Sequence, residues 1–253
     1  MIQLKNAQEL AKMRRACQIS AEALKLGGRS IEAGMTTADL DKIIYDYIKR
    51  HGVRPNFKGL YGFPGTACIS INDEVIHGLP SHSRQIRPGD IVSIDTGAAI
   101  NGFNGDNACT FPCGKVDIEA QRLMDVTKES LHRGIAAAVA GNRVGDIGHA
   151  VQSYVEENGF SVVRSFVGHG VGKELHEDPE VPNYGHAGHG VRLVNGMTIA
   201  IEPMVNQKHH SVKTLSDGWT VVTADGGLAA HFEHSIAILP GGPEILTIGW
   251  EEP

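Results

Sequence analysis

Apolar residues recur at helical spacing at the start of the chain. In the segment 6–26 they fall on one face of a helix, and they are Leu10, Met13, Cys17, Ala21 and Leu24. Asn6, with Glu9 three residues later, forms a capping-box pattern. The pair Gly27-Gly28 predicts the end of this helix.

A second apolar stripe follows Thr36-Thr37 and predicts a helix that ends at Gly52. This segment recurs 107 residues further along without a gap. Four residues are then identical, so that Gly34, Asp39, Tyr47 and Gly52 meet Gly141, Asp146, Tyr154 and Gly159. The preceding helix also recurs, at about 117–140. We therefore predict two similar halves, 6–111 and 117–247, inside one domain that spans 1–253.

Segments of strand character follow each pair of helices. The first two, 90–100 and 103–111, flank Asn101-Gly102, a strong signal for a two-residue hairpin turn. Further strands are expected at 160–167, 197–202, 219–223 and 231–239. The pattern predicts an α+β fold with helices outside, strands inside and a pseudo-twofold axis. Any site would lie in the cleft between the halves.

The hairpin brings two carboxylates together. A two-residue turn pairs Gly97 with Asp106, and Asp95 then lies on the same face as Asp106. Two such groups on an apolar hairpin repel each other unless a cation compensates them. Divalent ions favour carboxylate oxygens. Alternatively, both side chains face solvent, and the hairpin alone does not decide between these readings.

Composition and charge exclude several classes of protein. Hydrophobic residues make up 41% of the chain, and 29 acidic against 23 basic residues give a net charge of −6. Lys and Arg form no basic stripe, so we expect no direct nucleic-acid binding. No apolar run approaches the roughly 18 residues of a membrane helix, and the amino terminus lacks a signal-peptide pattern. Four unevenly spaced cysteines predict reduced thiols and a cytoplasmic location.

Four more polar groups stand at the ends of apolar segments or inside a strand pattern. His169 lies between glycines after the segment 160–167, and His176 follows seven residues later. Glu202 ends the apolar strand 197–202, and Glu233 lies within the strand 231–239.

With these motifs the chain resembles the methionine aminopeptidases, the type I branch in particular. The resemblance covers about residues 6–247. It is carried by the segment 71–78, the Asp95/Asp106 hairpin, the Gly-His-Gly segment at 168–170, Ile201-Glu202-Pro203-Met204 and Phe232-Glu233-His234. It implies the pita-bread fold, which agrees with the duplication.

The resemblance also implies a metal centre. Two divalent ions would be held by Asp95, Asp106, His169, Glu202 and Glu233, with Asp106 and Glu233 bridging them. Oxygen ligands with one imidazole suit Co2+, Fe2+, Mn2+ or Zn2+ and do not choose among them.

Roles for other residues follow from the same resemblance. Glu202 would also shuttle a proton. His176 would donate a hydrogen bond to the carbonyl oxygen as charge develops there, and His77 would lie beside the scissile amide. A methionine pocket would be formed by Phe57, Leu60, Phe63, Cys68, Leu175 and Trp219. Each of these six could equally be ordinary core, and only the resemblance favours a pocket.

The implied activity is removal of the initiator methionine from nascent proteins by two-metal-assisted amide hydrolysis, with a small second residue preferred. The partners would be the N-termini of nascent polypeptides near the ribosome. We expect a monomer and no membrane association.

Some positions depart from the family pattern. The segment 60–66 lacks the usual His, Lys and Ser, Asn104 replaces a usual His, and Leu175 stands where an aromatic residue is common. None is a ligand, but together they bear on the shape of the pocket. We interpret His186, His189, His209 and His210 as solvated surface residues, and His234 as facing away from Glu233.

Three rival interpretations remain. Prolidases and Xaa-Pro aminopeptidases share the fold and ligands but carry an extra domain ahead of the catalytic pattern, which here begins at Asn6. Type II methionine aminopeptidases carry an insertion between the positions of His176 and Glu202, which are only 26 residues apart here. A non-catalytic peptide-binding module would have lost ligands, and all five are present.

Overall fold

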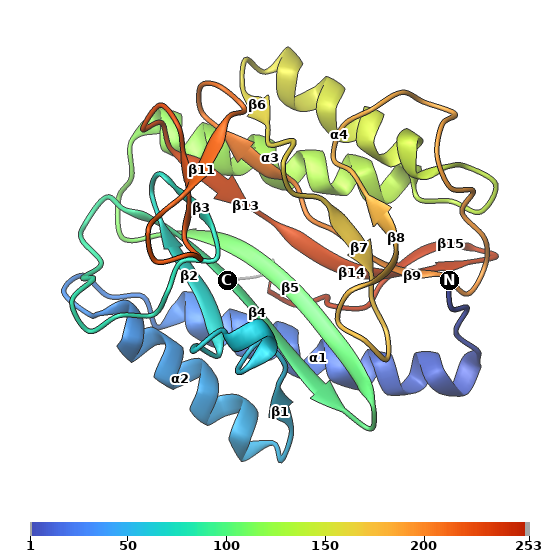
Figure 1. Cartoon of the computed structure of the whole chain (residues 1–253), viewed down its shortest axis with the longest axis horizontal. Helices are drawn as coiled ribbons and strands as arrows, with labels where there is room; N and C mark the ends of the chain where they lie inside the picture. Colours follow the sequence, from blue (N-terminus) through green and yellow to red (C-terminus); the bar gives the residue numbers. More distant parts are fainter. Residues whose placement is uncertain (1, 251–253) are drawn as a thin grey trace.

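The computed structural model describes residues 2–250, and the fold is built from two pairs of helices and an antiparallel sheet (Figure 1). The four helices are α1 (Ala7–Arg29), α2 (Thr37–Arg50), α3 (Ile118–Ala137) and α4 (Val144–Glu157). A 3-10 turn, η1 (Leu60–Gly62), follows α2. The predicted α+β class, with helices outside the sheet, is confirmed.

Helix α1 begins as predicted but ends later. The Asn6 side chain accepts hydrogen bonds from the backbone of Gln8 and Glu9, and Glu9 completes the capping box. The predicted stop at Gly27-Gly28 is wrong, because both glycines lie inside the helix. A Cβ at Gly28 would fall 2.6 Å or less from the Phe111 ring, so these glycines allow close packing instead of ending the helix.

The predicted duplication is visible in the backbone. Helix α4 begins and ends 107 residues after α2: Val144 corresponds to Thr37, and Glu157 corresponds to Arg50. An isolated bridge from Thr36 to Gln85 recurs, at the same offset, from Arg143 to Arg192. The aligned glycines share a left-handed backbone, with φ of 97° and 101° at Gly34 and Gly141 and of 72° and 79° at Gly52 and Gly159.

Nine strands form one antiparallel sheet in the order β1-β4-β5-β14-β9-β7-β8, with β2 on β4 and β15 on β14. Their bounds are β1 (Arg54–Pro55), β2 (Ala67–Ile71), β4 (Ile91–Ile100), β5 (Phe103–Pro112), β7 (Gly168–Gly170), β8 (Glu177–Val181), β9 (Thr198–Ile201), β14 (Glu233–Leu239) and β15 (Gly242–Ile245). Two three-stranded sheets contain β6 (Ser161–Val162), β10 (Met204–Asn206) and β13 (Ala229–His231), and β3 (Glu74–Ile76), β11 (Val212–Thr214) and β12 (Val221–Thr223).

The β4–β5 hairpin has the predicted register. Ile100 pairs with Phe103, and Gly97 pairs with Asp106. Both turn residues, Asn101 and Gly102, have positive φ, as a type I′ turn requires. The hairpin is therefore the part of the sheet that local sequence determines most directly.

Two of the predicted strands differ in the structure. Within 160–167 only Ser161–Val162 forms a strand. The residues after it form a loop, and its apolar side chains pack in a buried cluster that contains Val163, with Phe166 against it. The segment 231–239 is divided at Phe232. Residue His231 pairs with Met204 in a small sheet, whereas Glu233 pairs with Ala108 in the large one.

The helices cover the sheet from outside. Helix α1 packs on β4 and β5, and α3 packs on α4 and β13, so that the main core lies between helices and strands. Among residues 2–250, none of the helices combines the length and the apolar character that a bilayer crossing requires.

Candidate functional site

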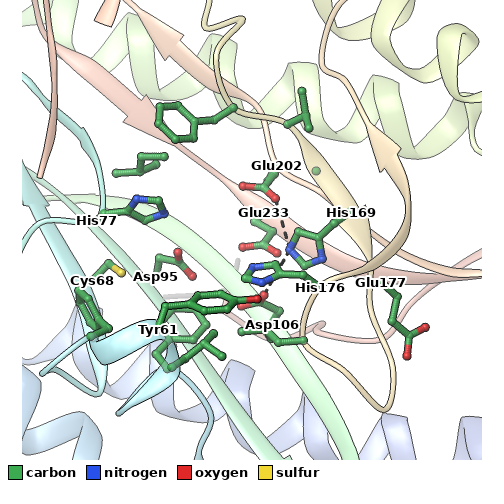
Figure 2. A pocket seen from close by; sticks show the side chains of 18 of the residues that line it. Tyr61, Cys68, His77, Asp95, Asp106, His169, His176, Glu177, Glu202 and Glu233 are labelled. Atoms are coloured by element: carbon green, nitrogen blue, oxygen red, sulfur yellow. Dashed lines mark ion pairs between the residues drawn. The ribbon is translucent and has the colours of Figure 1, made fainter. Parts of the chain in front are cut away.

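The five predicted ligand positions come from five neighbouring strands of the large sheet. Asp95 lies on β4, Asp106 on β5 and Glu233 at the start of β14; Glu202 directly follows β9 and His169 lies on β7. These strands are consecutive in the sheet order. All five side chains line one cavity of about 510 Å³ (Figure 2).

Distances within this group indicate a shared space. One ligand atom from each of Asp106, His169 and Glu233 lies within 4.8 Å of the other two. The His169 Nε2 atom is 3.6 Å from Asp106 Oδ2 and 3.5 Å from Glu202 Oε1, which is too long for hydrogen bonds. Two atoms that each bind one ion at about 2.1 Å stand roughly 3.0–3.5 Å apart. The separations are therefore close to those of ligands that surround a cation.

Burial makes this carboxylate group electrostatically unfavourable without a counter-charge. Desolvation raises the pKa of Asp106 to about 7. Desolvation and, secondly, repulsion from neighbouring carboxylates raise the pKa values of Asp95, Glu202 and Glu233 well above their usual range. No Lys or Arg occurs among the described residues that line the cavity. A divalent cation would supply the missing positive charge.

Several buried oxygens of the group also lack hydrogen bonds. Within residues 2–250, Asp95 Oδ1, Asp106 Oδ1 and Glu233 Oε1 are buried and make none. Buried polar atoms are rarely left in this state, and metal coordination is one way to satisfy them. The donor set of carboxylates and one imidazole thus fits divalent ions, although the number and identity of the ions stay predictions.

Two further predicted residues, His77 and His176, flank the carboxylates. His77 follows β3 with a left-handed backbone (φ 59°) and packs edge-on against Phe166. His176 precedes β8, and Figure 2 shows it pointing toward the carboxylates beside His169. Burial and, secondly, the neighbouring His176 lower the pKa of His77 to about 4. Burial also lowers the pKa of His176 below its usual value. Both imidazoles are therefore neutral at pH 7 and able to donate one hydrogen bond each.

The six residues predicted for the methionine pocket lie together. They form one apolar cluster next to the carboxylates and line the same cavity, and they are Phe57, Leu60, Phe63, Cys68, Leu175 and Trp219. Leu79 also packs in this cluster and was not predicted. The cavity thus has an acidic end and an apolar end, although the role of the apolar end as a methionine pocket stays a prediction.

Sequence reasoning missed His231 as a member of the site. Its Nε2 atom is buried 3.6 Å from Glu202 Oε2, and desolvation lowers its pKa to about 3. The signal was present in the sequence, because His231 and Glu233 are two residues apart in the predicted strand 231–239 and would share a face of it. Phe166 and Val167, directly before the Gly-His-Gly segment, also line the cavity and were not predicted as site residues.

The departures from the family pattern have different consequences. Asn104 holds the loop that carries His176: its side chain donates to the carbonyls of Gly172 and Lys173, each at 3.0 Å. Tyr61 stands at the cavity mouth, 78% exposed, and stacks on His176 with ring centroids 6.1 Å apart. Leu175 is buried in the apolar cluster.

The remaining histidines lie elsewhere. His186 and His189, like His209 and His210, are on loops away from the cavity. His234 faces away from Glu233: its Nδ1 atom is 2.9 Å from Thr247 Oγ1, and its ring stacks on Trp250.

Comparison with known proteins agrees with this geometry. The model of metallopeptidase family M24 matches residues 11–240. A methionine aminopeptidase of Clostridium perfringens is 55% identical over 98% of this chain and 99% of that protein. The crystal structure of a methionine aminopeptidase from Thermotoga maritima superimposes with a TM-score of 0.96 at 46% identity, covering 98% of this chain and 99% of that one.

A prolidase from Pyrococcus furiosus shares the fold only. Its TM-score is 0.78 at 22% identity, and the match covers 97% of this chain but 65% of the prolidase. The predicted pita-bread fold is thus confirmed, and the resemblance to methionine aminopeptidases holds over nearly the whole chain. The chain therefore belongs to metallopeptidase family M24 and, within it, groups with the methionine aminopeptidases, which makes it a hydrolase.

Proposed function

We propose that this enzyme removes the initiator methionine from nascent polypeptides with two divalent ions, and that it prefers a small second residue. The observation that carries the proposal is one cavity in which His169 and four carboxylates adjoin an apolar cluster. Asp106 and Glu233 are buried, and Asp95 and Glu202 are partly buried. The ions would be held by Asp95, Asp106, His169, Glu202 and Glu233. When bound, they supply Lewis acidity toward the scissile carbonyl and a water-derived nucleophile at neutral pH.

Three side chains of the protein would carry out proton transfer, hydrogen bonding and substrate positioning. Glu202 lies between His169 and His231, 3.5 and 3.6 Å from their Nε2 atoms, and would carry the proton from the nucleophile to the leaving amine. His176, neutral and directed at the carboxylates, would donate a hydrogen bond to the carbonyl oxygen as negative charge develops there. His77 would lie beside the scissile amide and the second residue.

Substrate orientation follows from the two ends of the cavity. The methionine side chain would fill the space among Phe63, Cys68 and Trp219, where burial of its apolar surface favours binding. Its amide bond would then lie over the carboxylates. The second residue would meet His77, Phe166 and Tyr61, all of which line the cavity, and these side chains would limit its size.

The cellular setting belongs to the same proposal. We propose a cytoplasmic monomer that acts on N-termini as they leave the ribosome, using Co2+, Fe2+, Mn2+ or Zn2+. Cys17, Cys68 and Cys113 are buried and form no disulfide, which suits a reducing compartment.

One experiment tests the proposed function as a whole. Metal-free protein should gain activity toward Met-Ala-Ser when divalent ions are added one at a time, and should stay inactive toward Ala-Pro peptides. Faster cleavage of the Ala-Pro peptides would overturn the proposal.

A further inference from the structure

The loop that carries His176 joins β7 to β8 and spans residues 171–176. Figure 2 shows two neighbouring side chains at its end pointing in opposite directions: His176 toward the carboxylates and Glu177 away from them. Glu177 also lines the cavity. Because it directly follows His176 in the chain, whatever holds its carboxylate also restrains the backbone that carries the His176 ring.

Glu177 forms an ion pair with Lys5, which comes from the amino-terminal arm of the chain, 172 residues away. Only 3% of the Lys5 side chain and 5% of the Glu177 side chain are exposed. Lys5 Nζ also donates to the carbonyl of Gln3 at 2.9 Å, and the second Glu177 oxygen accepts from the Glu174 backbone at 3.2 Å. The pair is thus buried and hydrogen-bonded on both sides.

The arm is itself fixed, so the pair has a rigid support. The Lys5 backbone N–H donates to the carbonyl of Gly196 at 2.7 Å, and the next residue, Asn6, caps helix α1. Lys5 therefore ties the Glu177 carboxylate to both helix α1 and the segment that leads into β9.

The loop backbone packs directly against this pair at Gly172. A Cβ on Gly172 would lie 2.6 Å from both Lys5 Nζ and Glu177 Oε1, a distance that real Cβ atoms do not adopt. Any side chain at position 172 would therefore force the ends of Lys5 and Glu177 to move. The loop, the arm and the pair therefore form one close-packed unit.

A second ion pair on the same loop provides a contrast. Lys173 Nζ is 3.2 Å from Glu9 Oε1, but these side chains are 55% and 24% exposed. Exposed pairs of this kind contribute little, whereas removal of one member of a buried pair leaves an uncompensated charge that shifts its surroundings.

We propose that Lys5 is a positioning residue for catalysis: through Glu177 it holds the loop so that the His176 ring stays directed at the scissile carbonyl. This inference rests on the role proposed above for His176. A misplacement of about 1 Å at such a group costs roughly a hundredfold in rate. Since His176 would act mainly in the transition state, the loss should appear in kcat rather than in KM.

The test is a kinetic cycle of Lys5→Met, His176→Ala and the double variant on the metal-loaded enzyme. We expect Lys5→Met to lower kcat by up to roughly a hundredfold with little change in KM, and to have no further effect once His176 is absent. If Lys5→Met does not fold, Glu177→Gln takes its place in the cycle. This variant keeps the side-chain shape but removes the charge, so kcat should fall less, and again with no further loss once His176 is absent. Lys173→Met, the control on the same loop, should behave as wild type.

A second readout does not depend on turnover. In the metal-free protein, the side-chain NMR signals of His176 should be single and sharp in wild type and in Lys173→Met, and broadened or doubled in Lys5→Met. Normal turnover in His176→Ala would refute the proposed role of His176 and this inference together. Two outcomes would overturn the positioning role alone. In the first, kcat falls steeply in His176→Ala and the effect of Lys5→Met is the same with and without His176. In the second, the His176 signal is unchanged in Lys5→Met.

Discussion

His169 and His176 lie edge to face with ring centroids 4.5 Å apart, yet only His169 is within 4 Å of the carboxylates, near Asp106 and Glu202. His176 instead has Tyr61 on its other side. Two adjacent imidazoles thus occupy different surroundings, which predicts different functions.

Substitution of each histidine should separate metal binding from turnover. His176→Ala should keep its metal affinity while kcat falls by roughly a hundred- to thousandfold, because one hydrogen-bond donor to a developing oxyanion is worth about 2.7–4 kcal/mol. His169→Ala should weaken metal affinity itself. Calorimetric metal titration beside peptide kinetics decides the matter; equal metal loss in both variants would contradict this division.

The metal-free enzyme should show a pH-dependent penalty from Asp106. Its pKa is raised to about 7 in the folded protein, so the stability it contributes is present below about pH 4 and is lost as pH rises toward 7. Asp106→Asn cannot ionise. Its melting temperature should therefore match that of wild type near pH 4 and exceed it increasingly up to pH 7.5.

This comparison has an internal control. Burial lowers the pKa values of His77, His169 and His231, so their contribution is lost as pH falls below about 6.5, in the opposite direction. Both proteins share these histidines, so the difference between them reports on Asp106 and on the repulsion that it exerts on Asp95, Glu202 and Glu233. Each pKa unit corresponds to about 1.4 kcal/mol, so the gap should reach a few kcal/mol. Manganese should close it by stabilising wild type; a gap independent of pH would refute the electrostatic account.

The second substrate residue should be restricted by the cavity mouth. Met-Gly and Met-Ala peptides should be cut, and Met-Lys and Met-Phe peptides should be poor substrates, because in the proposed orientation His77, Phe166 and Tyr61 would surround that position. Tyr61→Ala should raise kcat/KM for Met-Phe relative to Met-Ala. Comparable wild-type rates on all four peptides would show that the departures at residues 60–66 have opened the mouth.

The apolar end of the cavity should govern substrate affinity. Trp219 packs edge-on against Phe63 with ring centroids 5.2 Å apart. Trp219→Ala should raise KM for Met-Ala-Ser by roughly tenfold, as the loss of a few apolar contacts does, and leave metal binding unchanged. Leu215→Ala, an exposed position four residues earlier, is the control. A KM unaffected by Trp219→Ala would place the methionine elsewhere.

Local sequence patterns predicted the fold well where interactions within a short segment determine its structure. The hairpin register follows from Asn101-Gly102 alone, and the helix repeat follows from aligned stripes and glycines. The failure at Gly27-Gly28 has a non-local cause, since Phe111 packs where a side chain would be. The loop after Val162 likewise buries its apolar residues against distant strands, which no local pattern indicates.

Local sequence likewise predicted some of the candidate site and missed the rest. The motifs around the five predicted ligands pointed to residues that the structure places in one cavity, and His231 could have been found from its spacing to Glu233. The pairing of Lys5 with Glu177 could not, because nothing local to either residue indicates a partner 172 positions away. Only the folded chain brings them together.

The number and position of the metal ions test the central claim most directly. Anomalous scattering from a crystal soaked in manganese should show two peaks in the cavity, surrounded by Asp95, Asp106, His169, Glu202 and Glu233. A single peak coordinated elsewhere would contradict the account.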